Sequence, residues 1–410
     1  MSIKKNFDLP EVSHKELREE LIDAFDSLVP LYVWGMPGIG KSYACAEVAQ
    51  ELANRERRLF VDWNRSSRAV KHAVVNGRIP KELFGQRGNA GEVPAHLADC
   101  DEVGADQVFL FADYRLSQRD PSDITGLPCL DHSFVEWKPA MVFYALSMPA
   151  MAGLLLLDEI PQAMPVMQNA AYQLIQDRCC GEISFSDKVA VVAAGNRITD
   201  GGHQFQIPPA LANRFTHVEL TPPGAKAWSD WAIDHGVDGR VVGFLNFMPA
   251  SLLADMTDVR KNHAMAWASP RAWDKASAKI KSLPAATNAQ ISRVGRKVAS
   301  AVGLAHSVMF EAFLKTSSKL DLAGLLKHPA DVKAFDLQMK WALISAVAEH
   351  YREDKKALDD ILGLCGHLTA DFAVSMLRLM RRHDAVQFAG RLVKCKNRNV
   401  ALDYLKYFEG

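Results

Sequence analysis

A glycine-rich segment, GMPGIGKS at Gly35–Ser42, constrains the fold of this chain more than any other feature. It follows the short apolar run Leu31–Trp34 and opens a helical pattern over residues 41–56. Glycines permit positive φ, so successive N–H groups can point inward and hold an anion at the start of the helix. A strand, this loop and a helix therefore predict a phosphate-binding loop. The residues expected to contact a nucleotide are Gly35, Pro37, Gly38, Ile39, Gly40, Lys41, Ser42 and Tyr43.

Two residues of this loop have distinct expected roles. Lys41 would bridge the β- and γ-phosphates, and the Ser42 hydroxyl would ligate Mg²⁺. The alternative is a glycine-rich turn that happens to precede Lys-Ser. The strand before it and the helix after it favour the binding site.

A pair of carboxylates follows a second apolar run. The segment LLLLDE, Leu154–Glu159, is typical of a strand that is buried on both faces and ends in two acids. Ligands of open α/β sheets bind at the carboxyl ends of the strands. Asp158 is therefore the second predicted Mg²⁺ ligand, and Glu159 is the predicted group that polarises the attacking water. The alternative is a buried strand that ends in a solvated turn.

An amide ends the next apolar run, in the segment AAGNR at Ala193–Arg197. From this position Asn196 would hydrogen-bond the γ-phosphate and orient the water. Asn is also a common turn residue, so the prediction depends on the two motifs that precede it.

Strand and helix patterns alternate through the first half of the chain. The predicted strands are Leu31–Trp34, Leu59–Asp62, Val108–Tyr114, Leu154–Asp158, Val189–Ala194 and Phe215–Leu220. Helical patterns cover residues 41–56, 137–148 and 163–178. This alternation predicts an α/β domain whose parallel sheet is sandwiched by helices.

Only helical patterns follow Pro222 and Pro223, so we expect a domain boundary there. A chain of 410 residues has room for two or three domains. We predict an α/β domain over residues 1–222, with an insertion at 57–107. An α-helical segment over 223–310 and further helices of unassigned role over 311–410 would complete the chain.

Composition indicates a folded cytoplasmic protein. Hydrophobic residues make up 49% of the chain and charged residues 23%, and its seven cysteines are scattered without metal-site spacing. The N-terminal residues 1–12 contain no apolar core, so we expect no secretory signal. Residues 139–157 carry no charge, but Pro149 and Gly153 interrupt them. They predict a buried helix, a turn and a buried strand rather than a membrane span.

The order of these motifs resembles that of AAA+ ATPases and, within them, of the MoxR-like branch. The resemblance also rests on DPSDITG (120–126), PPALANRF (208–215) and ASPRAW (268–273), and it covers about residues 28–290. It implies a P-loop AAA+ core followed by an all-α lid, and hydrolysis of ATP with Mg²⁺ in a ring of subunits, expected to be a hexamer.

Two arginines gain roles from this resemblance. Arg214 is similar to the arginine finger that acts on the nucleotide of a neighbouring subunit, and Arg271 to the sensor-2 arginine of the lid. Ser269 and Pro270 place Arg271 in the first turn of a helix. The alternatives are a surface arginine and a solvated helix residue. Arg197 stands where the family has proline, and whether it shares the finger's role stays open.

Two further segments are similar to hairpins of this branch. In residues 127–139, Trp137 or Phe134 would either face a central pore or be buried, and we favour burial. The segment GEISFSD, residues 181–187, predicts a second hairpin.

Together these features predict an ATP-hydrolysing ring that remodels a partner protein, as a MoxR-like chaperone. The resemblance suggests a partner with a von Willebrand A-type domain. Lys and Arg number 48 and so do Asp and Glu, a balance that speaks against nucleic acid. The basic runs at 378–383 and 391–398 are accordingly expected to form solvated helix faces. A motor subunit acting on nucleic acid in a restriction or defence system, and a nucleotide-gated assembly scaffold, stay open as alternatives.

Overall fold

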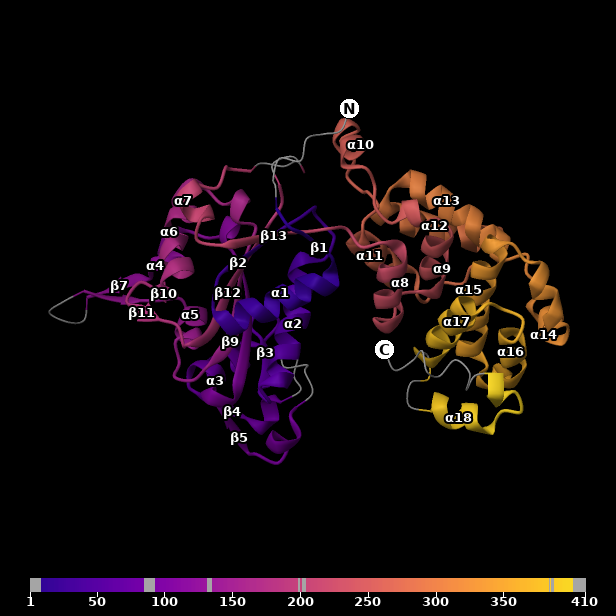
Figure 1. Ribbon diagram of the computed structural model, residues 1–410, viewed down its shortest axis with the longest axis horizontal. Coiled ribbons are helices and arrows are strands. Elements are labelled where there is room, and N and C mark those ends of the chain that lie inside the picture. The colour runs from indigo at the N-terminus through magenta and orange to yellow at the C-terminus, as the bar shows by residue number, and fades with distance from the viewer. Residues whose placement is uncertain are drawn as a thin grey trace. The chain divides into compact units, whose positions relative to one another are not determined.

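The computed structural model describes residues 9–84, 93–130, 135–197, 200, 204–382, 384 and 387–400. The chain divides into two compact units, Met1–Pro222 and Pro223–Gly410. The first contains a parallel sheet flanked by helices, and the second is helical throughout its described residues (Figure 1). The predicted fold class, a helix-sandwiched parallel sheet followed by an all-α region, is confirmed.

The central sheet of the first unit has seven strands, and all neighbouring pairs are parallel. Their order across the sheet is β1 (Glu11–Val12), β13 (Thr216–Leu220), β2 (Leu31–Trp34), β12 (Lys188–Gly195), β9 (Ala152–Asp158), β6 (Val108–Arg115) and β3 (Leu59–Asp62). The strand β2 thus lies between β12 and β13, the last two strands in chain order. A ligand-binding crevice is expected where the order of strands reverses in this way.

Helices cover both faces of this sheet because its strands are apolar on both sides. Within β2, Leu31 and Val33 pack with α1 (His14–Ser27) and α2 (Lys41–Arg55). Tyr32 and Trp34 alternate with them and join the core of the opposite face. The helices that contribute several residues each to that opposite core are α3 (Arg68–Val75), α5 (Met141–Leu146) and α6 (Pro165–Gln176).

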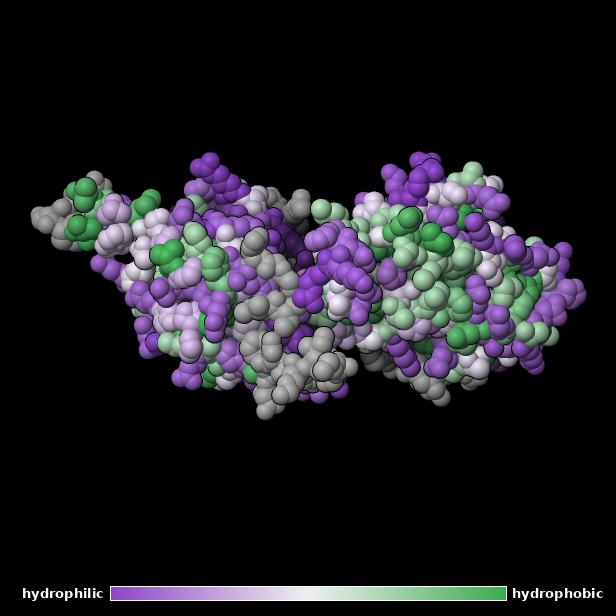
Figure 2. Space-filling view, turned by 90° about the horizontal axis from the view of Figure 1, so that it is seen from above, coloured by the Kyte–Doolittle hydropathy of each residue, from purple (hydrophilic) through white to green (hydrophobic). Residues whose placement is uncertain are grey.

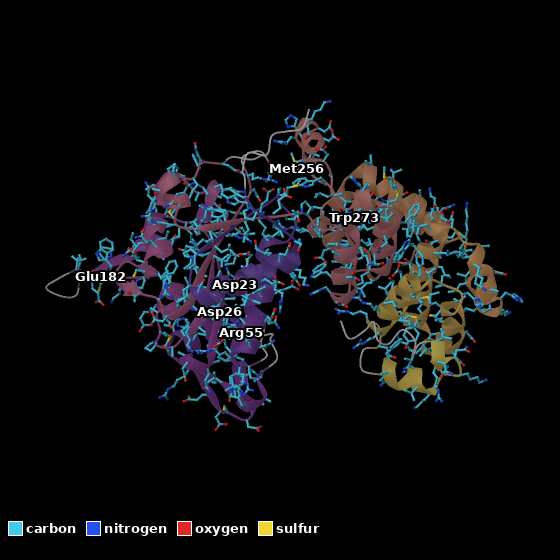
Figure 3. All side chains as sticks on the ribbon, viewed as in Figure 1. Asp23, Asp26, Arg55, Glu182, Met256 and Trp273 are labelled. Atoms are coloured by element: carbon cyan, nitrogen blue, oxygen red, sulfur yellow. The ribbon has the colours of Figure 1, made fainter. Side chains whose placement is uncertain are left out.

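Surface ion pairs join α1 to α2 on the first of these faces. Arg55 donates two hydrogen bonds to Asp26, at 2.9 and 2.5 Å (Figure 3). Arg18 likewise bonds Glu51 at 2.6 Å. Both pairs are exposed, so they add little to the stability that apolar packing provides.

The remaining elements of the first unit depart from prediction in two places. Residues 137–148 were expected to be helical, but they begin in the strand β8 (Glu136–Lys138), and α5 starts only at Met141. Trp137 and Lys138 pair with β7 (Leu127–Cys129), and this pairing outweighs the local helical pattern. Within 57–107, β3 joins the central sheet, whereas β4 (Arg78–Pro80) and β5 (Glu102–Gly104) form a separate pair.

Other expectations for this unit are confirmed. The uncharged segment 139–157 contains α5 and most of β9, both largely buried. The second hairpin is present, but it begins two residues before the predicted segment 181–187, as β10 (Cys179–Cys180) and β11 (Ile183–Ser184). Two short helices near the site are α4 (Pro121–Thr125) and α7 (Pro209–Ala212).

The second unit is a stack of helices around one core. They are α8 (Ala225–Asp234), α9 (Gly239–Phe247), α10 (Met256–Lys261), α11 (Pro270–Ile280), α12 (Asn288–Val302), α13 (Leu304–Ser317), α14 (Leu322–Lys327), α15 (Leu337–Glu353), α16 (Leu358–Cys365), α17 (Ala370–Arg382) and α18 (Phe388–Lys394). Trp273 is fully buried, and its indole donates to the Ser251 carbonyl at 2.8 Å; Figure 3 labels it. Phe244 packs edge-on against Phe310 and Phe313.

One hydrophobic cluster includes helices on both sides of residue 310. The segments 223–310 and 311–410 therefore share a core, and a functional division at residue 310 stays a prediction. All seven cysteines are free. Within the described ranges, no helix combines the length and apolarity that crossing a membrane requires.

Candidate nucleotide-binding site

The loop between β2 and α2 has the backbone of a phosphate-binding loop. Gly38 and Gly40 have φ of 84° and 106°, in the left-handed region that favours glycine. Gly40 is the N-cap of α2, and Lys41 is the first helical residue. The first N–H groups of a helix have no partner within it, so they are available to an anion held by this loop.

Close packing explains why the loop has glycine at a third position, Gly35. A Cβ on Gly35 would lie 3.0 Å from the Leu220 carbonyl oxygen, so a side chain there would push the loop away from β13. Ile39 is buried in the core with 1% exposed, whereas Tyr43 is 40% exposed on α2. Contact of Pro37, Ile39 and Tyr43 with a nucleotide stays a prediction.

The ammonium of Lys41 joins the loop to the end of β12. Its Nζ donates to the Gly35 carbonyl at 2.7 Å, to the Met36 carbonyl at 3.0 Å and to Asn196 Oδ1 at 2.7 Å. The side chain is buried, so these acceptors offset the cost of removing its charge from water. Lys41 and Asn196 are 155 positions apart in sequence, and the structure brings them into contact, whereas their roles toward a nucleotide stay predictions.

The two predicted metal ligands also meet. Ser42 Oγ donates to Asp158 Oδ2 at 2.7 Å, and Asp158 lies buried at the last position of β9. A hydroxyl and a carboxylate at this distance are hard oxygen donors that suit Mg²⁺. No group of three or more His, Cys, Asp or Glu side chains within the described part of the chain could hold a metal ion. Mg²⁺ would therefore depend on Ser42, Asp158 and the phosphates of a nucleotide.

Glu159 occupies an unusual backbone position directly after β9. Its φ of 60° and ψ of 32° lie in the left-handed region, which costs a non-glycine residue energy and often marks a functional site. Its carboxylate accepts a hydrogen bond from Ser117 Oγ at 2.9 Å. Ser117 follows β6, the strand next to β9. The side chain of Glu159 is thus held by the turn that follows the neighbouring strand β6.

A further carboxylate near these acids is Asp113 on β6. One of its oxygens, Oδ1, is buried without a hydrogen-bond partner, and the other lies 3.5 Å from the Arg115 guanidinium. The pKa of Asp113 is raised to about 6, first because the carboxyl is buried and second because Asp158 is negatively charged. The carboxyl ends of β6 and β9 therefore concentrate negative charge, which a cation would relieve.

Arg197 is engaged within its own unit. Its guanidinium lies 2.5 Å from Glu219 Oε1 on β13 and 3.6 Å from Asp200 Oδ2. Glu219 pairs in register with Trp34, the last residue of β2, on one side, while Gly195 of β12 pairs with Trp34 on the other. The Arg197–Glu219 ion pair thus links β12 to β13 at the end of the strand that carries the glycine-rich loop.

The two arginines singled out by the resemblance have different surroundings. Arg214 follows α7, bonds Gln176 Oε1 at 2.5 Å and lies 4.6 Å above the Tyr172 ring on α6. Arg271 is exposed in the first turn of α11, where Ser269 caps the helix by accepting from the Ala272 N–H at 3.2 Å. The local prediction for α11 is confirmed, and the roles of both arginines stay predictions.

The prediction that the aromatic residue of the β7–β8 hairpin is buried is wrong for Trp137. Its side chain is 40% exposed, and Leu127, Leu130 and Val135 are 65%, 77% and 47% exposed. A two-stranded hairpin has no sheet to cover its second face, so its apolar residues remain at the surface. Figure 2 shows hydrophobic surface at the end of this unit that carries the hairpin. Phe134 lies outside the described residues.

Sequence reasoning missed Ser117, Asp113, Glu219 and His14. Of these, His14 Nε2 bonds the Ile39 carbonyl of the glycine-rich loop at 2.9 Å. Asp113 and Ser117 come from β6 and the turn after it, Glu219 from β13 and His14 from α1, and none lies in a recognisable motif. The only available signal is a polar residue at the end of an apolar run, which Asp113 and Glu219 share with many turn residues.

Comparison with known proteins gives distant structural likenesses only. No family model and no curated protein matches the chain. The crystal structure of a putative ATPase from Cytophaga hutchinsonii is 11% identical, with a TM-score of 0.31 over 90% of this chain and 75% of that one. NtrX from Brucella abortus in complex with ADP is also 11% identical, with a TM-score of 0.32 over 96% of this chain and 67% of that one. Because these likenesses are so distant, the functional assignment depends on the site residues.

Proposed function

We propose that this chain is an ATPase of the AAA+ class that binds ATP with Mg²⁺ at the loop Gly35–Ser42. The observation that carries the proposal is the 2.7 Å hydrogen bond between Ser42 Oγ and Asp158 Oδ2. It joins the start of the helix after the glycine-rich loop to the carboxylate at the end of β9. Those are the two protein ligands that magnesium nucleotide sites of this kind require.

The remaining residues divide the chemistry of hydrolysis among them. Ser42 and Asp158 would hold Mg²⁺, which would supply positive charge that offsets the negative charge of the phosphates. Lys41 would exchange one of its present acceptors for a phosphate oxygen. Glu159 would accept a proton from the attacking water, and the hydrogen bond that Ser117 donates to one of its two carboxylate oxygens leaves the other oxygen able to do so. Asn196 would orient the water from the end of β12.

Assembly into a hexameric ring completes this proposal. Arg214 would stabilise negative charge on the nucleotide of a neighbouring subunit, and Arg271 would couple the nucleotide to the position of the helical unit. The exposed apolar residues of the β7–β8 hairpin favour a protein as the remodelled partner. We propose a partner with a von Willebrand A-type domain, handled in the manner of a MoxR-like chaperone.

Nucleotide binding is the first part to test. A fluorescent ATP analogue should bind the full chain in the presence of Mg²⁺, and Lys41→Ala should weaken that binding at least ten-fold. An exposed lysine of the same unit, Lys81, provides the control through Lys81→Ala. Equal binding by Lys41→Ala and the control, or none by the wild-type chain, would overturn the proposal.

The proposed sharing of each active site between two subunits is tested by measuring the ATPase rate per subunit at increasing protein concentration. The rate should rise as subunits associate and fall at least 10³-fold in Arg214→Ala, because an arginine finger contributes about 10³–10⁵ in rate. Arg68→Ala, an exposed arginine on α3, is the matched control. A rate that is independent of concentration and of Arg214 would contradict the ring. Stimulation of turnover by DNA would favour a nucleic-acid motor, and assembly without turnover a scaffold.

A further inference from the structure

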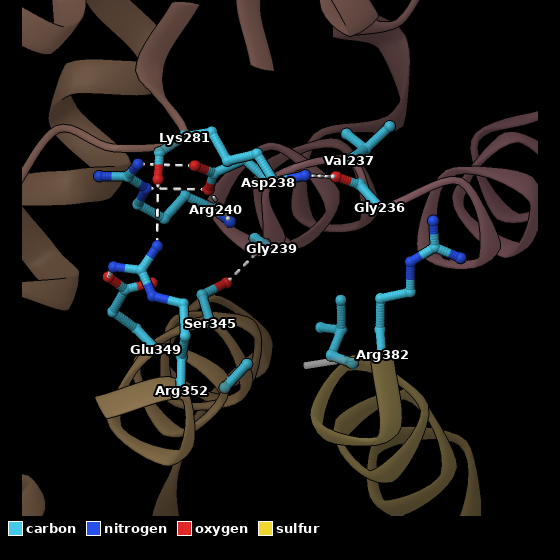
Figure 4. Close-up of a pocket in the computed structure, with 12 residues that line it drawn as sticks. Gly236, Val237, Asp238, Gly239, Arg240, Lys281, Ser345, Glu349, Arg352 and Arg382 are labelled. Atoms are coloured by element: carbon cyan, nitrogen blue, oxygen red, sulfur yellow. Dashed lines mark hydrogen bonds and ion pairs between the residues drawn. The ribbon is translucent and has the colours of Figure 1, made fainter. Parts of the chain in front are cut away.

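A pocket of about 100 Å³ lies within the second unit, away from the glycine-rich loop in sequence (Figure 4). It forms where the turn between α8 and α9 meets the last turns of α11 and α17 and one side of α15. Four cationic side chains line it, but only two carboxylates do. This imbalance is unexpected in a chain whose formal net charge is zero.

Two of the four cationic side chains each form an ion pair with one of the two carboxylates. Arg240 donates to Asp238 Oδ1 at 2.9 Å and to Oδ2 at 2.6 Å, and its other N–H groups bond the carbonyls of Leu283 and Ile280. Arg352 donates to Glu349 and to the Lys281 carbonyl, the latter at 3.1 Å. Figure 4 shows these pairs on one side of the pocket.

The other two cations are Lys281 and Arg382, and neither pairs with a carboxylate among the described residues. Lys281 Nζ donates to the Gly236 carbonyl at 2.9 Å. Arg382 extends from α17 toward the same glycine (Figure 4). A Cβ on Gly236 would lie 3.1 Å from Arg382 Nε and 3.4 Å from Lys281 Nζ. Both positive groups thus approach a single point, and Gly236, with φ of +70°, leaves that point open.

Helix ends explain only part of this arrangement. Lys281 follows the last residue of α11, and Arg382 is the last residue of α17. Cations at helix C-termini are stabilised by about 0.3–1 kcal/mol through the helix dipole. Each side chain gains that stabilisation separately from the other. Gly236 itself follows the C-cap of α8, whose C-terminus attracts both cations, but a partial charge of about −0.5 does not neutralise two full positive charges that repel each other.

We propose that this pocket binds a phosphate group, either as free phosphate or as the phosphomonoester of a small molecule. The Arg382 guanidinium presents a planar fork that matches phosphate oxygens, and the Lys281 ammonium adds a point charge. Their two uncompensated charges match the charge of about −1.5 to −2 that a phosphomonoester carries near pH 7. This site is separate from the proposed ATPase centre and does not depend on it.

The test must exclude phosphate bound at the glycine-rich loop, so all variants carry Lys41→Ala. Inorganic phosphate is titrated calorimetrically into the full-length Lys41→Ala chain, at constant ionic strength and without Mg²⁺. We expect one saturable site, and at least ten-fold weaker binding in Lys41→Ala/Arg382→Gln. The matched control is Lys41→Ala/Arg381→Gln, because Arg381 is an exposed neighbour on α17 that does not line the pocket.

A second variant distinguishes a loss of phosphate binding from a loss of folding. Lys281→Gln in the same background should also weaken phosphate binding at least ten-fold, while circular dichroism and the melting temperature stay unchanged. Absence of saturable binding, or equal affinity in Arg382→Gln and Arg381→Gln, would overturn the proposal.

Two further titrations identify the source of the phosphate group. Adenosine monophosphate that binds more tightly than inorganic phosphate would assign the site to a phosphomonoester. Equal or weaker binding would assign it to the free ion. Adenosine that binds as well as adenosine monophosphate would overturn the proposal, since the phosphate would then contribute nothing.

Discussion

Gly195, which ends β12 immediately before Asn196, provides a sharp test of the site geometry. A Cβ at this position would overlap the Tyr32 hydroxyl and lie 2.7 and 2.9 Å from Cδ and Cγ of Pro161. Tyr32 is fully buried and stacks on Trp34 with ring centroids 4.2 Å apart. Neither the tyrosine ring nor the proline ring can move aside easily. Gly195→Ala must therefore shift the backbone that carries Asn196.

The expected cost follows from this overlap. Overpacking of a core costs about 1–3 kcal/mol, and contact with two rigid rings places Gly195→Ala near the upper value. For a unit of this size, that loss lowers the melting temperature by roughly 6–12 °C. A displacement of Asn196 by about 1 Å should also lower kcat roughly 10²-fold. Thermal unfolding and steady-state ATPase measurements on the same preparations test both effects.

Two companion variants make the interpretation specific. Gly224→Ala is the control, because a Cβ there meets no atom within 4 Å. The Tyr32 hydroxyl is buried without a hydrogen-bond partner, so Tyr32→Phe alone should not destabilise the protein. Combined with Gly195→Ala, it should recover part of the lost stability, while the contacts with Pro161 remain. Wild-type stability and activity in Gly195→Ala would refute the reasoning.

Three further predictions concern the charged groups of the site. Glu159→Gln should keep nucleotide affinity but lower kcat about 10²–10⁴-fold in a phosphate-release assay, and turnover close to wild type would remove Glu159 from the proposed chemistry. Arg197→Met leaves the buried carboxylate of Glu219 without its ion-pair partner and should lower the free energy of unfolding by about 3–5 kcal/mol in urea. Adding Glu219→Met should restore much of the lost free energy of unfolding. A double variant as unstable as Arg197→Met alone would show that the two side chains are not energetically coupled. The raised pKa of Asp113 means that the folded state binds more protons than the unfolded state between about pH 4 and 6. Without Mg²⁺ and nucleotide, stability should therefore fall by about 3 kcal/mol as pH rises through this range, and Asp113→Asn should remove that dependence.

Local patterns were sufficient for much of the fold. The apolar runs at Leu31–Trp34 and Leu59–Asp62 form strands with the predicted bounds, because a strand buried on both faces must be apolar throughout. The helix after the glycine-rich loop begins at the predicted Lys41. The hairpin at residues 127–138 was harder to predict. Its strand Glu136–Lys138 is stabilised by pairing with Leu127–Cys129 rather than by any periodicity of its own.

The candidate site likewise contains residues that could be predicted from the sequence and contacts that could not. Lys41, Ser42, Asp158 and Asn196 lie at the ends of strands or at the start of a helix, and the sequence alone marks such positions. Parallel strands bring their carboxyl ends to one edge of a sheet, so their proximity could also be anticipated. The sequence by itself thus determined the parallel sheet, the glycine-rich loop and the polar residues placed at that edge.

The tertiary structure decided which of these side chains touch. Ser117 reaches Glu159 because β6 lies beside β9, and Glu219 reaches Arg197 because β12 and β13 flank the same strand. In the helical unit, Lys281 and Arg382 meet at Gly236 only because the ends of two helices, far apart in sequence, pack against one turn. Strand order and helix packing result from burying a whole core, and hydrogen bonds across them depend on positions within about 0.5 Å. Periodicity and propensity act over a few residues, so they specify the elements, and the packing of the whole chain specifies the contacts between them.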